Sequence, residues 1–131
     1  MHVEMILKKN ERIDDLEYKE LKIIQNTEGF CFGIDAVLLS DFAKEIRNNS
    51  IVLDLGTGTG ILSILLAAKT KLKKIYGIEI QEEVAEMAKR SVVLNKLESK
   101  IEIINKNIKE LEEIFERNSF DSIITNPPYK K

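Results

Sequence analysis

The chain has 131 residues and a mass of 15.0 kDa, with 44% apolar and 32% charged side chains and a formal net charge of −2. This length and apolar fraction predict a single globular domain and exclude disorder of the whole chain. The near balance of 20 basic and 22 acidic side chains excludes nucleic-acid binding by overall charge, although a local basic face remains possible. The single cysteine, Cys31, cannot form an internal disulfide or a zinc site alone, so we expect a reducing, cytoplasmic setting and no bound metal.

The start of the chain is predicted to form a short hairpin. Charges within the first ten residues argue against a signal peptide. Residues 21–25 and 30–32 are β-prone, and they flank a turn-like tetrad at residues 26–29. These two runs are therefore the expected strands of the hairpin.

A helix is predicted after the hairpin. Asp35 is suited to cap it, and apolar residues recur at helical spacing as far as about Arg47. We expect residues 1–50 to form a hairpin and helix that pack on a second unit, residues 51–131.

From residue 51 onward, strands alternate with helices. Strands are predicted over residues 51–55, 74–79, 100–105 and 120–125, and helices over residues 61–69, 82–95 and 108–115. The residues of the second helix predicted to face the sheet are Val84, Met87, Ala88, Ser91 and Val92. This alternation predicts βαβ units with a parallel sheet and right-handed crossovers. The longest nearly apolar stretch is far shorter than the roughly 20 residues that cross a membrane, so we expect no membrane contact.

A glycine-rich loop, Asp-Leu-Gly-Thr-Gly-Thr-Gly at residues 54–60, separates the first of these strands from its helix. Ligands of open α/β sheets bind beyond the carboxyl ends of the strands, where glycine lets the backbone approach closely. An unliganded strand-to-helix turn is the alternative interpretation. A P-loop would need a lysine that this loop lacks, and a dinucleotide fingerprint would need glycine where Ile61 stands. The loop therefore favours a nucleoside cofactor without a pyrophosphate.

Glu79 ends the second predicted strand, 23 residues after Gly56. An acidic side chain about 20 residues beyond such a loop can accept hydrogen bonds from both ribose hydroxyls and exclude a 2′-phosphate. A solvated glutamate at a strand end is the alternative. Its position in step with the loop favours a ribose-binding role.

An Asn-Pro-Pro-Tyr motif at residues 126–129 follows the fourth predicted strand. Paired prolines by themselves indicate only the end of a strand. Asn126 Oδ1 and the Pro127 carbonyl, stiffened by Pro128, can accept both N–H bonds of a planar amino group and direct its lone pair. Tyr129 can stack on the substrate plane. The motif predicts transfer of a methyl group from sulfonium to nitrogen by positioning, without a covalent enzyme intermediate.

Together these motifs resemble the class I S-adenosylmethionine-dependent methyltransferases. Residues 52–60 and 77–80 carry the resemblance, and Asn-Pro-Pro-Tyr is similar to the motif of enzymes that methylate adenine N6, guanine N2 or glutamine N5. The resemblance implies an α/β, Rossmann-like fold whose mostly parallel sheet has strand order 3-2-1-4 and stops before the family's fifth strand. It also implies S-adenosylmethionine as cofactor and S-adenosylhomocysteine as product.

The resemblance assigns roles to individual residues. Asp54 and the loop backbone would hold the methionine part, the loop glycines would line the adenosyl group, and Glu79 would hold the ribose. An acidic residue after the family's third strand often contacts the adenine amino group; the matching residue here is Asn107, whose amide can accept the same bond more weakly. The expected cofactor-binding residues are Asp54, Leu55, Gly56, Thr57, Gly58, Gly60, Glu79, Ile80, Asn107 and Ile108, and the expected catalytic residues are Asn126, Pro127, Pro128 and Tyr129.

The first fifty residues extend the resemblance to one group of enzymes. Residues 11–16, 21–25 and 29–39 resemble the front of the bacterial tRNA1(Val) adenine-37 N6-methyltransferases, of the methyltransferase small domain family. The segment lacks the long helical front domain of release-factor glutamine methyltransferases, which favours RNA over protein as the substrate. The resemblance and the Asn-Pro-Pro-Tyr motif imply adenine N6 of tRNA. Guanine N2 of rRNA, glutamine N5 of a protein, and a cofactor-binding half-domain without activity are the alternatives.

The fourth predicted strand should become an exposed edge. Seven strands are usual in the family, and the resemblance covers nearly the whole of this chain with only four of them. Residues 122–125 would then present an unpaired apolar edge, which can recruit a second chain. We expect self-association through this edge.

Overall fold

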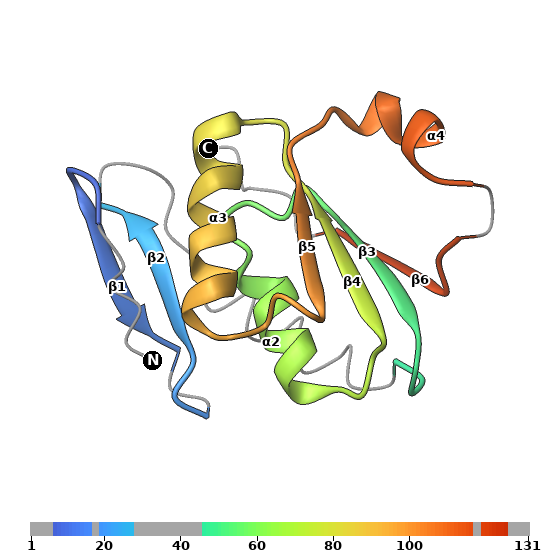
Figure 1. The fold of residues 1–131 in the computed structure, drawn as a ribbon, viewed down its shortest axis with the longest axis horizontal. Helices are drawn as coiled ribbons and strands as arrows, with labels where there is room; N and C mark the ends of the chain where they lie inside the picture. The colour runs from blue at the N-terminus through green and yellow to red at the C-terminus, as the bar shows by residue number, and fades with distance from the viewer. Residues whose placement is uncertain (1–6, 17–18, 28–45, 117–118, 126–131) are drawn as a thin grey trace.

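The computed structural model describes residues 7–16, 19–27, 46–116 and 119–125. Their elements, in chain order, are β1 (Glu11–Asp15), β2 (Lys22–Asn26), β3 (Ile51–Leu55), α2 (Ile61–Lys69), β4 (Lys74–Ile78), α3 (Glu82–Leu94), β5 (Ile101–Ile104), the 3₁₀ turn η2 (Ile108–Glu110), α4 (Leu111–Ile114) and β6 (Ser122–Thr125). Figure 1 shows α3 between the β1–β2 hairpin and the four-stranded sheet. No helix in these ranges is long and apolar enough to cross a bilayer.

The four-stranded sheet confirms the predicted order. Its strands are all parallel and run β5-β4-β3-β6, so the first strand of the repeating unit lies inside the sheet, beside the fourth. Observed ends lie within two residues of the predicted ones for the four strands of this sheet and for the helices predicted over residues 61–69 and 82–95. The carboxyl ends of β3, β4 and β5 therefore meet at one edge, and the loops that follow them lie side by side.

One face of the sheet carries the main core. Val52, Ile75 and Ile101 point from three neighbouring strands into the same apolar cluster as α2 and α3. Seven consecutive residues of α2 are buried, which is why this helix is apolar all round. On α3 four of the five predicted inward residues are buried, but Ala85 takes the place expected for Val84.

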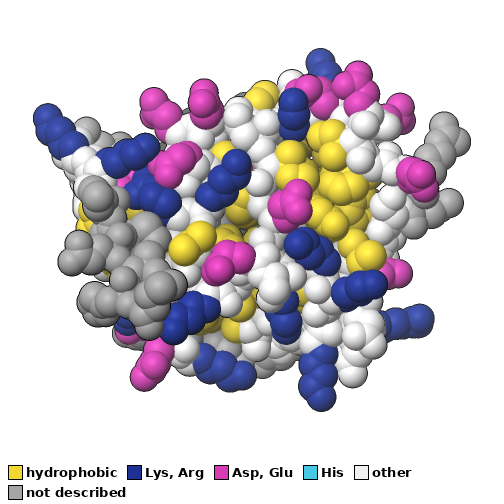
Figure 2. Space-filling view, in the orientation of Figure 1, with side chains coloured by type: hydrophobic (Ala, Val, Ile, Leu, Met, Phe, Trp, Pro, Cys, Tyr) yellow, Lys and Arg dark blue, Asp and Glu magenta, His cyan; other side chains and the backbone are white. Residues whose placement is uncertain are grey.

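The opposite face carries three aromatic rings. Tyr76, Phe115 and Phe120 pack edge to face, with centroid separations of 4.8 to 6.0 Å. Figure 2 shows hydrophobic side chains gathered in a patch on this side of the molecule, next to α4. The predicted helix over residues 108–115 is replaced by a 3₁₀ turn and one α-helical turn, because the chain becomes extended at Phe115 and carries that ring onto the sheet.

The hairpin differs from the predicted one. The strand expected over residues 21–25 is present as β2, but its partner is β1, which precedes it, in an antiparallel register that pairs Ile13 with Ile24. β1 escapes prediction because four of its five side chains are charged and its one apolar side chain is exposed, so no apolar alternation marks it. The strand expected over residues 30–32 and the helix expected from Asp35 lie outside the described residues.

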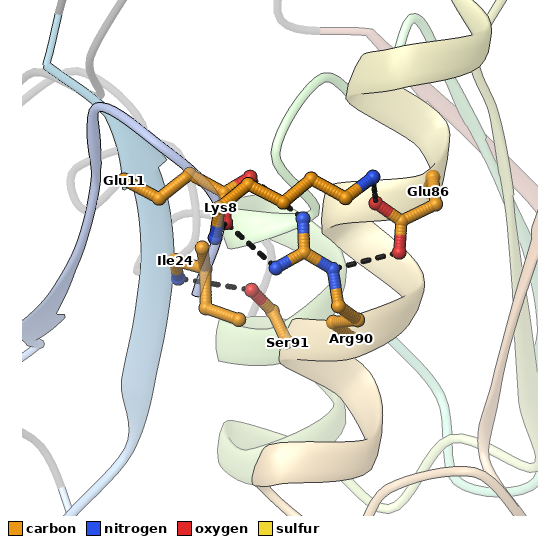
Figure 3. Close-up of polar contacts among 6 residues, drawn as sticks. All are labelled: Lys8, Glu11, Ile24, Glu86, Arg90 and Ser91. Carbon is orange, nitrogen blue, oxygen red and sulfur yellow. Dashed lines mark hydrogen bonds and ion pairs between the residues drawn. The ribbon is translucent and has the colours of Figure 1, made fainter. Parts of the chain in front are cut away.

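Polar side chains of α3 fasten the hairpin. Arg90 donates from Nη1 and Nη2 to the two carboxylate oxygens of Glu11, at 2.7 and 2.6 Å, and from Nε to Glu86 at 2.7 Å, and Lys8 adds a bond to Glu86 at 2.8 Å (Figure 3). The paired side chains of Glu11 and Arg90 are only 6% and 16% exposed. The hydrogen bond from Arg90 is the main cause of the lowered pKa of Glu11.

The backbone of β2 also meets α3 side chains. Ser91 Oγ accepts the N–H of Ile24 at 2.9 Å, and Asn95 exchanges two hydrogen bonds with the backbone N–H and C=O of Lys22, at 2.8 and 2.7 Å. These side chains satisfy backbone groups that would otherwise form an open strand edge. The helix that begins three residues after Glu79 is thus also the support of the hairpin.

We expect Arg90→Ala to lower the free energy of unfolding by about 2 kcal/mol, because it leaves the poorly exposed Glu11 carboxylate without its cation. Lys8→Ala is the matched control, since its ion pair is 63% and 40% exposed and should contribute at most about 1 kcal/mol. Urea unfolding of both variants measures the difference, and equal losses would contradict it.

Candidate functional site

The loop between β3 and α2 is built from left-handed glycines. Gly56, Gly58 and Gly60 have φ of +68°, +57° and +86°, a region that strains other residues. A Cβ placed on Gly56 or Gly58 would meet no atom within 4 Å, so the backbone there faces open space. The loop therefore presents bare backbone that a ligand can approach.

A fourth glycine, Gly77 of β4, lets the loop lie against the sheet. A Cβ at Gly77 would lie 2.8 Å from Thr57 Oγ1 and 2.9 Å from Thr57 Cβ, closer than real contacts allow. Thr57 is fastened there because its N–H donates to the Ile78 carbonyl at 2.9 Å. The loop is thus held by β4, the strand that leads to Glu79.

Asp54 lies at the base of the loop and is fully buried. Its Oδ2 accepts hydrogen bonds from Thr57 Oγ1 and Ser63 Oγ, both at 2.8 Å. Its Oδ1 has no hydrogen-bond partner among the described residues. The pKa of Asp54 is raised to about 6, mainly by burial and to a smaller extent by the nearby charge of Glu79, against the opposing effect of the two hydroxyls. A buried acceptor of this kind calls for a donor from a ligand or water.

Glu79 directly follows β4 and is buried, so the alternative of a solvated strand-end glutamate is wrong. Its Oε1 accepts the N–H of Gly58 at 2.9 Å and its Oε2 accepts the N–H of Gln81 at 3.1 Å. Each oxygen of an ionised carboxylate keeps a further lone pair after one such bond. Two backbone groups therefore fix the orientation of Glu79 and leave acceptor capacity on both oxygens.

Asn105, which the sequence did not single out, joins the segments that follow β4 and β5. Its Nδ2 donates to the carbonyls of Glu79 and Ile80, at 2.9 and 3.0 Å. The Glu79 N–H also donates to the Ile104 carbonyl at 3.0 Å. A polar side chain at the carboxyl end of a buried strand was the available signal for Asn105.

Asn107 caps the turn that follows. Its Oδ1 accepts the N–H of Lys109 at 3.0 Å, and its own N–H donates to Glu110 Oε1 at 2.9 Å, which completes a capping box. Contact of Asn107 with adenine remains a prediction. Ile80 and Ile108, on the two segments that Asn105 joins, are 61% and 52% exposed and offer apolar surface to a ligand.

Residues 126–129 lie outside the described residues. β6 ends at Thr125, which is paired with Leu55 in the sheet register and donates from Oγ1 to the Leu55 carbonyl at 3.2 Å. The chain therefore enters the Asn-Pro-Pro-Tyr motif from a point beside the start of the glycine loop.

We expect ionisation of Asp54 to destabilise the folded protein. Its folded pKa of about 6 lies above the ordinary value of 3.8, so the folded state binds the proton more tightly. The contribution of this group to the free energy of unfolding should fall by about 3 kcal/mol as pH rises from 4 to 6, and then level off. Over that pH range the stability of Asp54→Asn, measured by urea unfolding, should rise relative to that of the wild type. Parallel pH profiles of the two proteins would contradict this.

Known proteins are similar to this chain in both sequence and fold. The family model "Methyltransferase small domain" matches residues 32–131. A Porphyromonas gingivalis relative named tRNA1(Val) (adenine(37)-N6)-methyltransferase is 33% identical in an alignment of 123 residues that covers 90% of this chain and 48% of the relative.

Two solved structures show the likeness in fold. The aTrm5 structure, in complex with tRNALeu, has a TM-score of 0.73 and 24% identity, and the match covers 94% of this chain and 34% of that one. The Pyrococcus abyssi tRNA (uracil-54, C5)-methyltransferase, in complex with S-adenosyl-L-homocysteine, has a TM-score of 0.65 and 23% identity. The match covers 95% of this chain and 30% of that one.

The chain spans about half the length of the curated relatives it matches. The solved structures show that its four-stranded sheet belongs to a Rossmann-like methyltransferase fold. Since the family model covers most of the sequence, the chain belongs to the methyltransferase small domain family.

Proposed function

We propose that this chain binds S-adenosylmethionine and serves methyl transfer to an exocyclic amino group, with adenine N6 of tRNA as the substrate. The observation that carries the proposal is the arrangement at the carboxyl edge of the sheet. A left-handed glycine loop lies between two carboxylates. The first, Asp54, is buried and its Oδ1 has no partner within the described part of the chain; the second, Glu79, is held by backbone N–H groups.

The residues present fit the proposed cofactor. Asp54 Oδ1 and the loop backbone suit the amino-acid end, and the free lone pairs of Glu79 suit two ribose hydroxyls. The next segments along the sheet edge, with exposed Ile80 and Ile108, suit an apolar base ring. Bound S-adenosylmethionine supplies an electrophilic methyl group on sulfur.

Residues 126–129 are proposed to hold the methyl acceptor. Asn126 Oδ1 and the Pro127 carbonyl would accept the two N–H bonds of the substrate amine, so that its lone pair faces the methyl group. Pro128 would stiffen this backbone and Tyr129 would stack on the base. Support comes from Thr125, the residue before the motif, whose pairing with Leu55 starts the motif beside the loop.

The choice of tRNA rests on similarity. The Porphyromonas gingivalis and Flavobacterium johnsoniae relatives are named tRNA1(Val) (adenine(37)-N6)-methyltransferases, at 33% and 29% identity. A tRNA substrate would also place the protein in the cytoplasm. Guanine N2 of rRNA, glutamine N5 of a protein and a half-domain without activity are separate outcomes of the test below.

The test measures binding and transfer separately. Calorimetry with S-adenosylhomocysteine should show binding that Glu79→Ala weakens about tenfold, because ribose loses charge-assisted acceptors. Glu83→Ala is the matched control, since Glu83 is an exposed glutamate of the first turn of α3. Radiolabelled methyl transfer to bulk tRNA should occur with the wild type and be lost in Asn126→Ala, with cofactor affinity retained.

Each outcome has a distinct meaning. Absence of S-adenosylhomocysteine binding would overturn the proposal. Binding without transfer to tRNA, rRNA or protein would make the chain a cofactor-binding half-domain. Labelling of rRNA or of a protein glutamine, with tRNA unlabelled, would replace the proposed substrate and keep the reaction.

We further propose that β6 mediates self-association. Among the described residues β6 pairs only with β3, so its other edge carries no strand. Ile123, at the middle of this edge strand, is 63% exposed. An exposed apolar edge favours pairing with a second chain.

Light scattering should show species larger than a monomer for the wild type. Ile123→Lys should shift the population toward monomer, because an edge charge opposes strand pairing. Ile114→Lys, at a 37% exposed position of α4, is the control and should leave the population of monomer unchanged. A monodisperse wild-type monomer would refute the proposal.

A further inference from the structure

Ser63 is the one polar side chain in the buried stretch of α2 that runs from Ile61 to Ala67, and it is completely buried. A serine in a helix usually faces solvent or bonds back to the preceding turn of its own helix. Here Ser63 Oγ donates to Asp54 Oδ2 at 2.8 Å, across the glycine loop, from the first turn of α2. An apolar residue would suit this core better, so the hydroxyl calls for another explanation.

The hydroxyls of Ser63 and Thr57 act on the same carboxylate oxygen. Both donate to Asp54 Oδ2, and their own oxygens are 3.2 Å apart. Neither is charged, so they hold the carboxylate in place without neutralising it. The remaining oxygen, Oδ1, is buried and has no hydrogen-bond partner among the described residues. Asp54 thus places an oriented negative charge at the base of the loop, and no cation among the described residues neutralises it.

We propose that Ser63 is a positioning residue of the cofactor site: together with Thr57 it aligns Asp54 so that Oδ1 receives the cationic amino group of the ligand's amino-acid part. This inference rests on the proposed function. Ser63 acts on the ligand through Asp54, because its hydroxyl donates to the Asp54 carboxylate.

The physical basis is the loss of one of two fixed donors. Without the Ser63 hydroxyl, Oδ2 keeps only Thr57, which belongs to the loop itself. The carboxyl group can then rotate, and its protonated form, which offers the ligand a weaker acceptor, becomes more favourable. Both changes weaken an ammonium contact and leave nucleoside contacts elsewhere in the site unaltered.

Two ligands separate this role from general support of the fold. S-adenosylhomocysteine carries the amino group, whereas 5′-methylthioadenosine has the same nucleoside and sulfur without the amino-acid part. Calorimetry should show Ser63→Ala binding S-adenosylhomocysteine about tenfold more weakly, which corresponds to about 1.4 kcal/mol, with 5′-methylthioadenosine changed less than about twofold. Ser63→Thr keeps the hydroxyl and should restore most of the affinity.

Two further variants complete the experiment. Ser91→Ala removes a buried serine of α3 that bonds the Ile24 backbone, so it should leave both affinities unchanged. Thr57→Val removes the other hydroxyl at nearly constant volume, and it should reproduce the selective loss even if Ser63→Ala fails to fold.

The failures are distinguishable. In Ser63→Ala and in Thr57→Val, an equal loss of affinity for both ligands, or no loss for either, would overturn the positioning role. The proposed cofactor site would stand in both cases. A wild type that binds neither ligand would overturn the proposed function and this inference together.

Discussion

The carboxylate of Asp54 is buried at the end of a central strand, in a place where no cation neutralises it among the described residues. Such a group is costly unless it is hydrogen-bonded, and two hydroxyls from the following loop and helix supply the bonds. The loop must therefore fold back over the strand, which its left-handed glycines allow and Gly77 leaves room for. The shape of the site follows from satisfying this one side chain.

The site and the hairpin are connected through α3. Glu79 stands three residues before this helix and is oriented by the N–H groups of Gly58 and Gln81. Further along the helix Arg90 binds Glu11 of β1. Packing of the hairpin on α3 thus continues the same core that supports the glycine loop.

The sequence predicts the parallel sheet because its signals are local: apolar strands, helical periodicity, and glycines at one strand end. It misses β1, whose side chains are mostly charged and whose place is set by pairing with β2. It also misses Ser63 and Asn105, whose roles depend on partners brought close by the fold. Its position makes Asn107 a predicted adenine contact, whereas its capping bonds are seen only in the structure.

The proposed cofactor-binding residues and the proposed methyl-transfer motif belong to different parts of the sheet. Asp54 lies near the carboxyl end of β3, and Glu79 and Asn105 directly follow β4 and β5. Hydrogen bonds link the loop to Glu79 and Glu79 to Asn105. The Asn-Pro-Pro-Tyr motif instead follows β6, an edge strand of the described sheet that pairs with β3 alone. The proposed cofactor site is consequently supported from several sides, whereas the start of the proposed transfer motif depends on one strand pairing. Loosening β6 should therefore impair methyl transfer before it impairs cofactor binding.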